Sequence, residues 1–207
     1  MHRHSEIPFW LCVGDVADAA GAYEPVDAPL YWIKGNNEDF DRIAARDFPH
    51  GLHYIPNGSE MRIGGVNVAG LGGTFAPTMY ELEPEALPHP KKGTAKATEL
   101  ADRRRHFVRA EVEACKRLRG VDILLTHEAP RPFRVPAPGG RPGNDAGKTP
   151  INEIVTAMAP RLHLFGHHHR FTERELHGVR SVCLDLVSRS YLLIDRVTLK
   201  YEVVSEP

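Results

Sequence analysis

Cysteine is scarce in this chain, with three residues in 207, and no two of them form a CxxC pair. Cys12, Cys115 and Cys183 lie far apart in the sequence. This spacing excludes a disulfide framework and a zinc ribbon, and it suits a reducing compartment. We therefore expect the protein to be cytoplasmic.

Long apolar runs are also missing. No segment approaches the roughly 20 apolar residues that a helix needs to span a bilayer, and Met1 to Glu6 contain no apolar signal region. The formal net charge of -1 argues against binding nucleic acid by bulk charge alone. The hydrophobic content of 42% is ordinary for a globular protein, and we expect one domain over residues 1–207.

Short apolar runs, in contrast, recur along the chain. Four of them predict buried strands: Phe9–Val13, Leu30–Ile33, Asp122–Thr126 and Arg161–Phe165. Strands that are apolar throughout belong to sheets covered on both faces. Further β-structure is predicted as a strand or hairpin over residues 62–71 and as an antiparallel meander over residues 179–204.

Helices are predicted in three places between these strands. Three-to-four-residue apolar spacing from Thr94 to Arg119 predicts the longest one, which Gly120 would end. Residues 39–47 predict a brief helix. Thr149–Pro150 predicts the start of another helix, which runs to about residue 159. The segment from Arg131 to Pro150 holds five prolines and four glycines, so we expect a long loop there.

Polar side chains follow each of the four apolar runs, namely Asp15, Asn36, His127 and the pair His167 and His169. Ligands of parallel sheets bind beyond the carboxyl ends of the strands, so we expect these residues to converge. A carboxylate, an amide oxygen and several imidazoles suit Mn, Fe, Zn or Ni better than Ca or Mg. The alternative for the three consecutive histidines is a solvated loop.

Four short sequence motifs, taken in their order along the chain, resemble those of a known family. They are Gly14-Asp15-x-x-Asp18, Gly35-Asn36-Asn37-Glu38, Leu124-Leu125-Thr126-His127-Glu128 and Gly166-His167-x-His169. Together they resemble the calcineurin-like metallophosphoesterases over roughly residues 10–170. Within that family, Arg62-Ile63-Gly64-Gly65 and His127-Glu128-Ala129-Pro130 are most similar to the lariat-debranching-enzyme branch and its bacterial relatives.

The resemblance implies a four-layer α/β/β/α sandwich with one or two divalent transition-metal ions. Asp15 would bridge both ions, Asn36, His127 and His167 would complete one of them, and His169 would reach the other. The implied reaction is hydrolysis of a phosphate mono- or diester by attack of a metal-bound hydroxide. The substrate would be a small phosphorylated molecule or a nucleotide.

One family block is absent from this sequence. The family begins with a strand that ends in Asp-x-His, and no such block precedes residue 10. We therefore expect a sandwich that lacks its first strand and helix, with unpaired sheet edges where they would lie. Either the sequence starts downstream of its natural start, or the protein is a divergent one-metal member.

Asn37 is a second departure, at the position of the family histidine that protonates the leaving group or stabilises its charge. An amide can donate a hydrogen bond but delivers no proton at neutral pH. We therefore expect Asn37 to act in catalysis without general acid chemistry. Turnover should then be slow on alkyl phosphates and favour good leaving groups.

Two further residues are predicted to contact substrate. His168 should face away from its two neighbours, toward substrate or solvent, and Arg134 lies in the loop after His127, where it could hold phosphate. A plain surface loop is the alternative for Arg134. Two other functions are left open, a non-catalytic metal- or phosphate-binding descendant and an RNA-acting debranching enzyme or nuclease.

Overall fold

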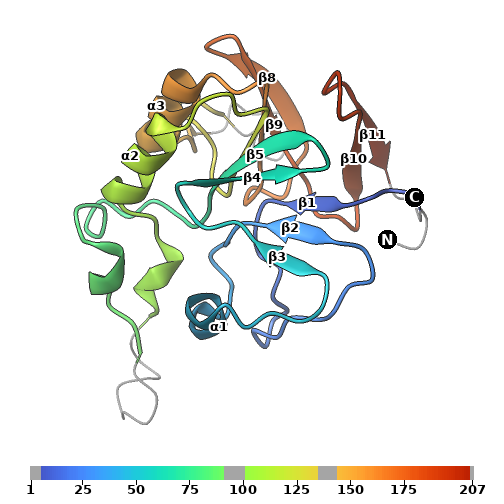
Figure 1. The fold of residues 1–207 in the computed structure, drawn as a ribbon. Coiled ribbons are helices and arrows are strands. Elements are labelled where there is room, and N and C mark those ends of the chain that lie inside the picture. The colour runs from blue at the N-terminus through green and yellow to red at the C-terminus, as the bar shows by residue number, and fades with distance from the viewer. Residues whose placement is uncertain (1–5, 91–100, 135–143, 206–207) are drawn as a thin grey trace.

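The computed structural model describes residues 6–90, 101–134 and 144–205, and within them the chain forms a mixed α/β fold (Figure 1). One sheet has three parallel strands in the order β1-β2-β3. Their bounds are β1 Trp10–Cys12, β2 Leu30–Trp32 and β3 Leu52–Tyr54. The first two strands were predicted from their apolar runs, whereas β3 was missed because His53 interrupts its sequence, which therefore does not form an apolar run.

A second sheet holds six strands in the order β4-β5-β6-β7-β9-β8. Their bounds are β4 Ser59–Ile63, β5 Val66–Leu71, β6 Ile123–Thr126, β7 Leu162–Phe165, β8 Thr172–Leu176 and β9 Val179–Cys183. Strands β5, β6, β7 and β9 are parallel, and the edge strands β4 and β8 are antiparallel to their neighbours. Every residue of β6 and β7 is buried, as their continuous apolar sequences predicted.

A separate antiparallel hairpin lies beside the three-stranded sheet. It consists of β10, Ser190–Ile194, and β11, Tyr201–Ser205, and the ring of Tyr191 contacts that of Trp10 edge to face at 6.0 Å between centroids. The predicted meander over residues 179–204 is therefore wrong in part. Strand β9 runs parallel to β7, because its apolar side chains complete the buried six-stranded sheet, and it does not pair with β10.

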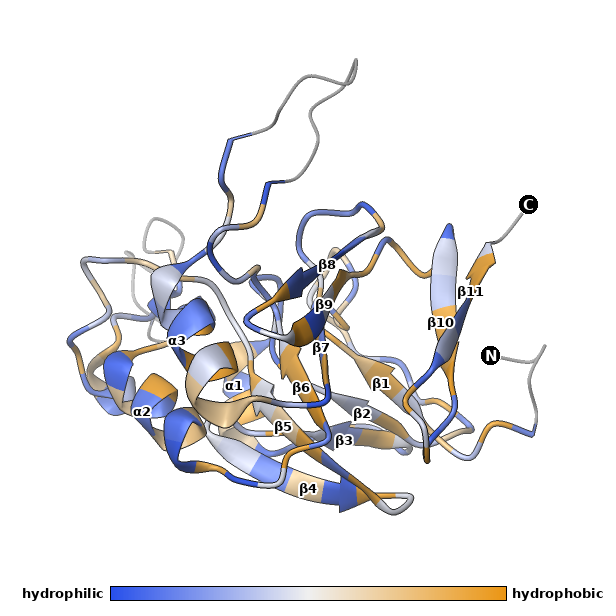
Figure 2. Cartoon of the chain, turned by 90° about the horizontal axis from the view of Figure 1, so that it is seen from above, coloured by the Kyte–Doolittle hydropathy of each residue, from blue (hydrophilic) through white to orange (hydrophobic). Residues whose placement is uncertain are grey.

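The main core lies between the two larger sheets. Side chains of Ile33 and Ile55 from the three-stranded side pack with Val68, Leu125 and Leu164 of the six-stranded sheet. The other face of the six-stranded sheet packs against α2, Arg109–Arg117, and α3, Thr149–Met158. Figure 2 shows apolar strands β6 and β7 inside the molecule and hydrophilic segments on the outward sides of these helices.

The far face of the three-stranded sheet has a core of its own, formed around Trp32 and joined by Ile43 of α1, Phe40–Ala45. Helix α1 lies within the predicted range, and the carboxylate of Asp39 caps it by accepting hydrogen bonds from two main-chain amides at 3.0 Å. Helix α3 also lies where Thr149–Pro150 predicted it.

The long helix predicted from Thr94 to Arg119 is confirmed only over α2 and is wrong over residues 101–108. Residues 94–100 lie outside the described part of the chain, η2 at Arg103–Arg105 is a single 3-10 turn, and α2 begins only at Arg109. Phe107 and Val108 are fully buried, and the amide of Phe107 donates to the carbonyl of Thr74 at 3.1 Å. These apolar residues are thus buried by a non-helical segment. Another 3-10 turn, η1 at Pro84–Ala86, lies in the proline-rich stretch.

No helix among the described residues is both long and apolar enough to cross a membrane.

Candidate functional site

Four strand ends meet at one place in the molecule. Asp15 follows β1, Asn36 follows β2, His127 follows β6 and His167 follows β7. Nε2 of His127 lies 3.0 Å from Oδ1 of Asn36 and 3.6 Å from Oδ2 of Asp15. The rings of His127 and His167 lie 5.0 Å apart between centroids. Residues separated by up to 152 positions are thus brought together by the ends of two different sheets.

Two glycines allow the loops after β1 and β2 to approach each other. A Cβ at Gly35 would lie 2.0 Å from Oδ1 of Asp15, and a Cβ at Gly14 would lie 2.8 Å from the main chain of Gly35. Gly14 also has a φ of +105°, a conformation that other residues rarely adopt. Both glycines are therefore required by the close packing of the site.

The carboxylate of Asp15 is held by the neighbouring loop. Its Oδ1 accepts hydrogen bonds from the main-chain amides of Asn36 and Asn37, each at 2.9 Å. Asp15 itself has a φ of +58°, an uncommon left-handed conformation for a residue other than glycine. With Oδ1 engaged in this way, Oδ2 is the oxygen that faces His127.

Glu38 links the loop after β1 to the loop after β2 by hydrogen bonds. Its Oε1 accepts from the amides of Gly35 at 3.0 Å and Val16 at 3.2 Å, and its Oε2 accepts from the amide of Ala17 at 3.3 Å and the hydroxyl of Tyr23 at 3.1 Å. Burial raises the pKa of Glu38, and these four donors oppose that rise. Sequence reasoning noted Glu38 only as part of a block and did not predict this role.

The imidazole of His127 has a defined proton position. Its Nδ1 lies 2.8 Å from the carbonyl oxygen of Val13, which can only accept, so Nδ1 carries the proton. Burial lowers the pKa of His127, although Asp15 opposes that shift, so the neutral ring is favoured. A neutral ring protonated at Nδ1 presents a lone pair at Nε2, toward the oxygens of Asn36 and Asp15.

Three electron-pair donors therefore converge on one point without a proton between them. Such an arrangement is repulsive by itself and is stabilised by a cation at the centre. The set of one carboxylate, one amide oxygen and one imidazole fits a divalent transition metal. It does not amount to a complete cage, because the described residues contain no group of three or more His, Cys, Asp or Glu side chains placed to hold an ion.

His167 and His169 lie at the rim of this set. His167 is half-buried, and burial together with the nearby His127 lowers its pKa. His169 is exposed, and its carbonyl oxygen accepts from Nη1 of Arg189 at 3.3 Å. Both histidines have positive φ, +67° and +48°, so the backbone after β7 is held in uncommon conformations.

The three predicted catalytic or substrate residues lie in different surroundings. Asn37 is exposed beside Asp15. His168 is half-buried, and its ring lies 5.4 Å from that of His167 between centroids. Its Nε2 is buried with no hydrogen-bond partner among the described residues. Burial lowers its pKa to about 4.

Arg134 is exposed, and its described contacts lie away from the four strand ends. It forms an isolated bridge with Asp145, and its carbonyl accepts from Nη2 of Arg174 at 3.4 Å. The predicted loop over residues 131–150 falls partly outside the described residues, at 135–143. The structure therefore does not bring Arg134 to the donor set.

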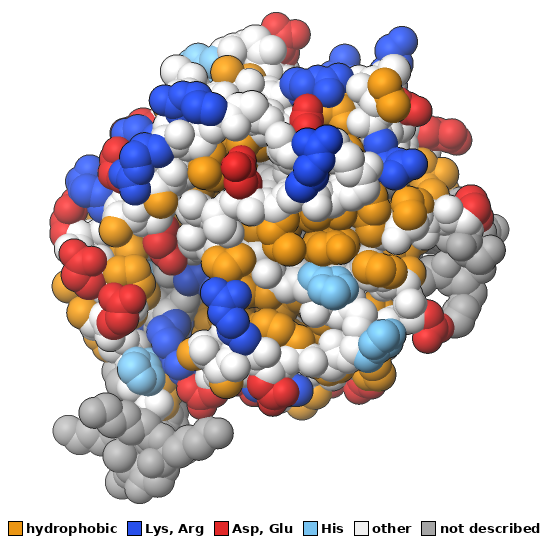
Figure 3. All heavy atoms as spheres, in the orientation of Figure 1, with side chains coloured by type: hydrophobic (Ala, Val, Ile, Leu, Met, Phe, Trp, Pro, Cys, Tyr) orange, Lys and Arg blue, Asp and Glu red, His pale blue; other side chains and the backbone are white. Residues whose placement is uncertain are grey.

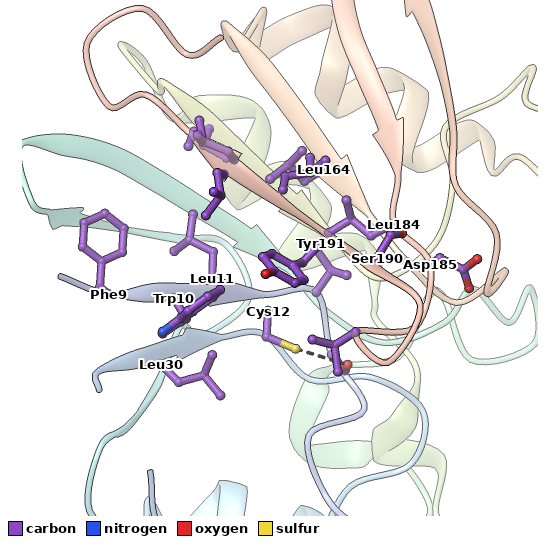
Figure 4. Close-up of a pocket in the computed structure, with 18 of the residues that line it drawn as sticks. Phe9, Trp10, Leu11, Cys12, Leu30, Leu164, Leu184, Asp185, Ser190 and Tyr191 are labelled. Carbon is purple, nitrogen blue, oxygen red and sulfur yellow. Dashed lines mark hydrogen bonds between the residues drawn. The ribbon is translucent and has the colours of Figure 1, made fainter. Parts of the chain in front are cut away.

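A cavity of about 600 Å³ opens beside the donors. Asp15, His127, His167 and His169 are among its lining residues. Apolar side chains of β1, β10 and neighbouring segments line it too, together with the charged residues Asp185, Asp195 and Arg196. Figure 4 shows Leu11 and Tyr191 among the side chains that line it, and Figure 3 shows hydrophobic side chains gathered on this face of the molecule.

Comparisons with known proteins identify structures with a similar fold but do not identify a family. No family model matches the sequence, and no curated protein matches it. Fourteen chains of solved structures are similar to it. One crystal structure aligns with a TM-score of 0.58 at 13% identity, over 86% of this chain and 66% of that one. The chain thus spans just under two thirds of that structure, and at this identity the likeness supports the mixed α/β fold alone.

Proposed function

We propose that this protein is a metal-dependent phosphoesterase that hydrolyses a phosphate mono- or diester. The observation that carries the proposal is the lone pair at Nε2 of His127, which faces the oxygens of Asn36 and Asp15 at 3.0 Å and 3.6 Å. A cation is the simplest partner for three such donors. Bound there, a divalent metal ion would lower the pKa of water and neutralise charge on phosphoryl oxygens.

The order of the packed elements supports the metallophosphoesterase type of this activity. Helices α2 and α3, the six-stranded sheet, the three-stranded sheet and α1 follow one another through three successive cores. This order agrees with the four-layer α/β/β/α sandwich that the sequence blocks imply. The site lies at the carboxyl ends of parallel strands from both sheets, which is where such folds bind ligands.

The chain's own residues have separable tasks in this proposal. The amides of Asn36 and Asn37 fix one oxygen of Asp15, so the carboxylate is oriented before any ligand arrives. The hydrogen bond from His127 to Val13 holds the imidazole in the tautomer that can bind a metal. Exposed Asn37 can donate a hydrogen bond to a phosphoryl or leaving-group oxygen, but it cannot supply a proton.

Titration with Mn²⁺, followed by assay on bis-p-nitrophenyl phosphate, tests the proposal. Asp15→Asn and His127→Gln should each weaken Mn²⁺ binding at least tenfold and reduce turnover in parallel. Asp18→Asn is the matched control, because the exposed carboxylate of Asp18 accepts from the amides of Ala20 and Ala22 in its own turn. Unchanged Mn²⁺ affinity in both site variants would remove the metal site from this place.

A non-catalytic metal or phosphate binder is the second candidate, favoured by Asn37, which cannot supply a proton where the family has a histidine. The same titration distinguishes the two. Tight Mn²⁺ binding without turnover of the p-nitrophenyl diester would support the binder, and turnover that requires Asp15 would support the enzyme.

A further inference from the structure

The cavity beside the candidate site shares its lining with the donor set. Asp15, His127, His167 and His169 line it together with apolar side chains from several strands. A molecule held at the donors therefore contacts this cavity as well, and a bulky group on that molecule would extend into it. The volume of about 600 Å³ is ordinary for a small-molecule pocket. The chemistry of the walls thus bears on which molecules the site accepts.

The walls of the cavity carry apolar side chains from four segments of the chain. The lining includes Leu11 of β1, Leu164 of β7, Leu184 after β9, and Leu192 and Ile194 of β10. All five belong to the core between the two larger sheets or pack against it, and Figure 4 labels the first three. Leu164 is buried, whereas the other four are only half-buried. They therefore keep apolar surface that an occupant of the cavity can cover.

Two exposed apolar residues also line this cavity. Large apolar side chains are exposed at four positions in the described part of the chain, and two of these, Leu186 at 38% and Val187 at 75%, belong to the lining. Apolar side chains that are exposed together mark binding sites more often than scattered ones do. Because both residues reach solvent and the cavity, they form its mouth.

Three charged residues in the lining already have partners within the chain. The carboxylate of Asp185 accepts from Nη1 of Arg189 at 3.2 Å. The carboxylate of Asp195 accepts from three groups of its own turn at 2.7–3.1 Å, and Nη1 of Arg196 donates to the carbonyl of Gly64 at 3.1 Å. These charges therefore need no polar ligand, and the donor set is the part of the cavity that calls for one.

We propose that the substrate is an amphiphilic phosphate ester, with its phosphate group at the donor set and a hydrocarbon group in the cavity. This inference rests on the proposed phosphoesterase function and names its substrate class. A sugar or another polar group would lose hydrogen bonds to water against these walls. A hydrocarbon chain, in contrast, gains about fourfold in affinity for each methylene group that leaves water. The size of the cavity fits a single dissolved molecule.

Three phosphate monoesters test the apolar subsite by binding alone. They are octyl phosphate, methyl phosphate and ethoxyethoxyethyl phosphate, whose polar chain has the same length as the octyl chain. Titration calorimetry of the wild-type protein with Mn²⁺, below the micelle concentration of octyl phosphate, should show at least about 30-fold tighter binding of the octyl ester than of either other ester. Equal affinity for the three would overturn the proposal. An octyl advantage that appears only in micelles would indicate adsorption to a lipid surface and would overturn it as well.

Two diesters with one leaving group separate this inference from the proposed activity. In octyl p-nitrophenyl phosphate and methyl p-nitrophenyl phosphate the departing group is identical, so the octyl chain should lower KM at least tenfold with little change in kcat. Turnover of both diesters with equal KM would contradict the substrate class and leave the phosphoesterase in place. Tighter binding of octyl phosphate without turnover of either diester would contradict the phosphoesterase and support the amphiphilic ligand.

Substitutions in the walls locate the hydrocarbon chain. Leu192→Gln replaces an apolar wall residue with a polar one of similar size and should lower the affinity ratio of octyl to methyl phosphate at least tenfold. Val187→Gln, at the exposed mouth, should fold as the wild type does and lower the ratio at least about threefold. Val197→Gln is the matched control, because Val197 is 80% exposed and does not line the cavity. Wild-type ratios in both Val187→Gln and folded Leu192→Gln would place the chain elsewhere and contradict the proposal.

Discussion

His127 and Val13 are joined across the two sheets by a hydrogen bond of 2.8 Å from the imidazole Nδ1 to the main-chain carbonyl. Val13 follows β1 in the three-stranded sheet, and His127 follows β6 in the six-stranded sheet. The bond therefore ties together the two halves of the candidate site and sets the tautomer of the imidazole at the same time. Any change that separates the sheets should disturb the donor set before it unfolds the cores.

Gly35→Ala should displace Asp15. The new Cβ would lie 2.0 Å from Oδ1 of Asp15 and 2.4 Å from its main-chain nitrogen, so the loop after β1 must move. We expect a loss of about 1–3 kcal/mol in the free energy of unfolding and a larger relative loss of Mn²⁺ affinity. Isothermal titration and urea unfolding measure the two effects.

Gly21→Ala is the control for that substitution. Its Cβ would meet nothing within 4 Å, although its φ of +79° makes any side chain unfavourable by about 1 kcal/mol. It should lower stability and leave Mn²⁺ affinity unchanged. Equal metal affinity in the two alanine variants would show that the contact between Gly35 and Asp15 does not position the carboxylate.

Glu38→Gln should loosen the loops behind the site. The amide group that replaces one carboxylate oxygen cannot accept, so two of the four donors now bound by Glu38 lose their partner. We expect a destabilisation of about 1–3 kcal/mol and weaker Mn²⁺ binding, measured by chemical unfolding and titration. Glu24→Gln, at an exposed position, is the control and should change neither. Wild-type stability of Glu38→Gln would contradict the role given to this carboxylate.

The sequence predicted the convergence of Asp15, Asn36 and His127 because each follows an apolar strand, and parallel strands place such ends together. It could not predict the tautomer of His127, because the carbonyl of Val13 that sets it lies 114 positions away and depends on how the two sheets pack. The helix predicted from Thr94 is wrong over residues 101–108 for a related reason. Apolar spacing at Val108 matches a helix, yet tertiary packing buries that residue just before α2 begins.

Asn37→His should restore proton delivery if the proposed phosphoesterase activity is correct. General acid catalysis is typically worth about 10²–10⁴-fold and matters most for poor leaving groups. We expect turnover of an alkyl phosphate to rise much more than that of p-nitrophenyl phosphate. Asn57→His, at an amide that bonds to the main chain of Gly72 outside the donor set, is the comparison variant. A gain confined to the aryl substrate would contradict the acid role at position 37.

His163 should make stability depend on pH. It is fully buried between Thr126 and Ser181, and burial lowers its pKa to about 3. The hydroxyl of Thr126 donates to the carbonyl of Glu128 at 2.7 Å, so it accepts from Nε2 of His163, which leaves Nδ1 to accept from Ser181. The folded state thus holds a neutral imidazole in a satisfied network.

In the unfolded chain the same imidazole titrates near pH 6.5. Below that pH the unfolded state binds a proton that the folded state does not bind until about pH 3, so stability falls by about 1.4 kcal/mol per pH unit from this residue. Between pH 7 and pH 5.5, wild-type protein should lose about 1 kcal/mol more than His163→Asn does in urea unfolding. His177→Asn, which removes an exposed histidine, should keep the wild-type slope. Equal slopes for His163→Asn and wild type would mean that His163 accepts a proton in the folded state without penalty.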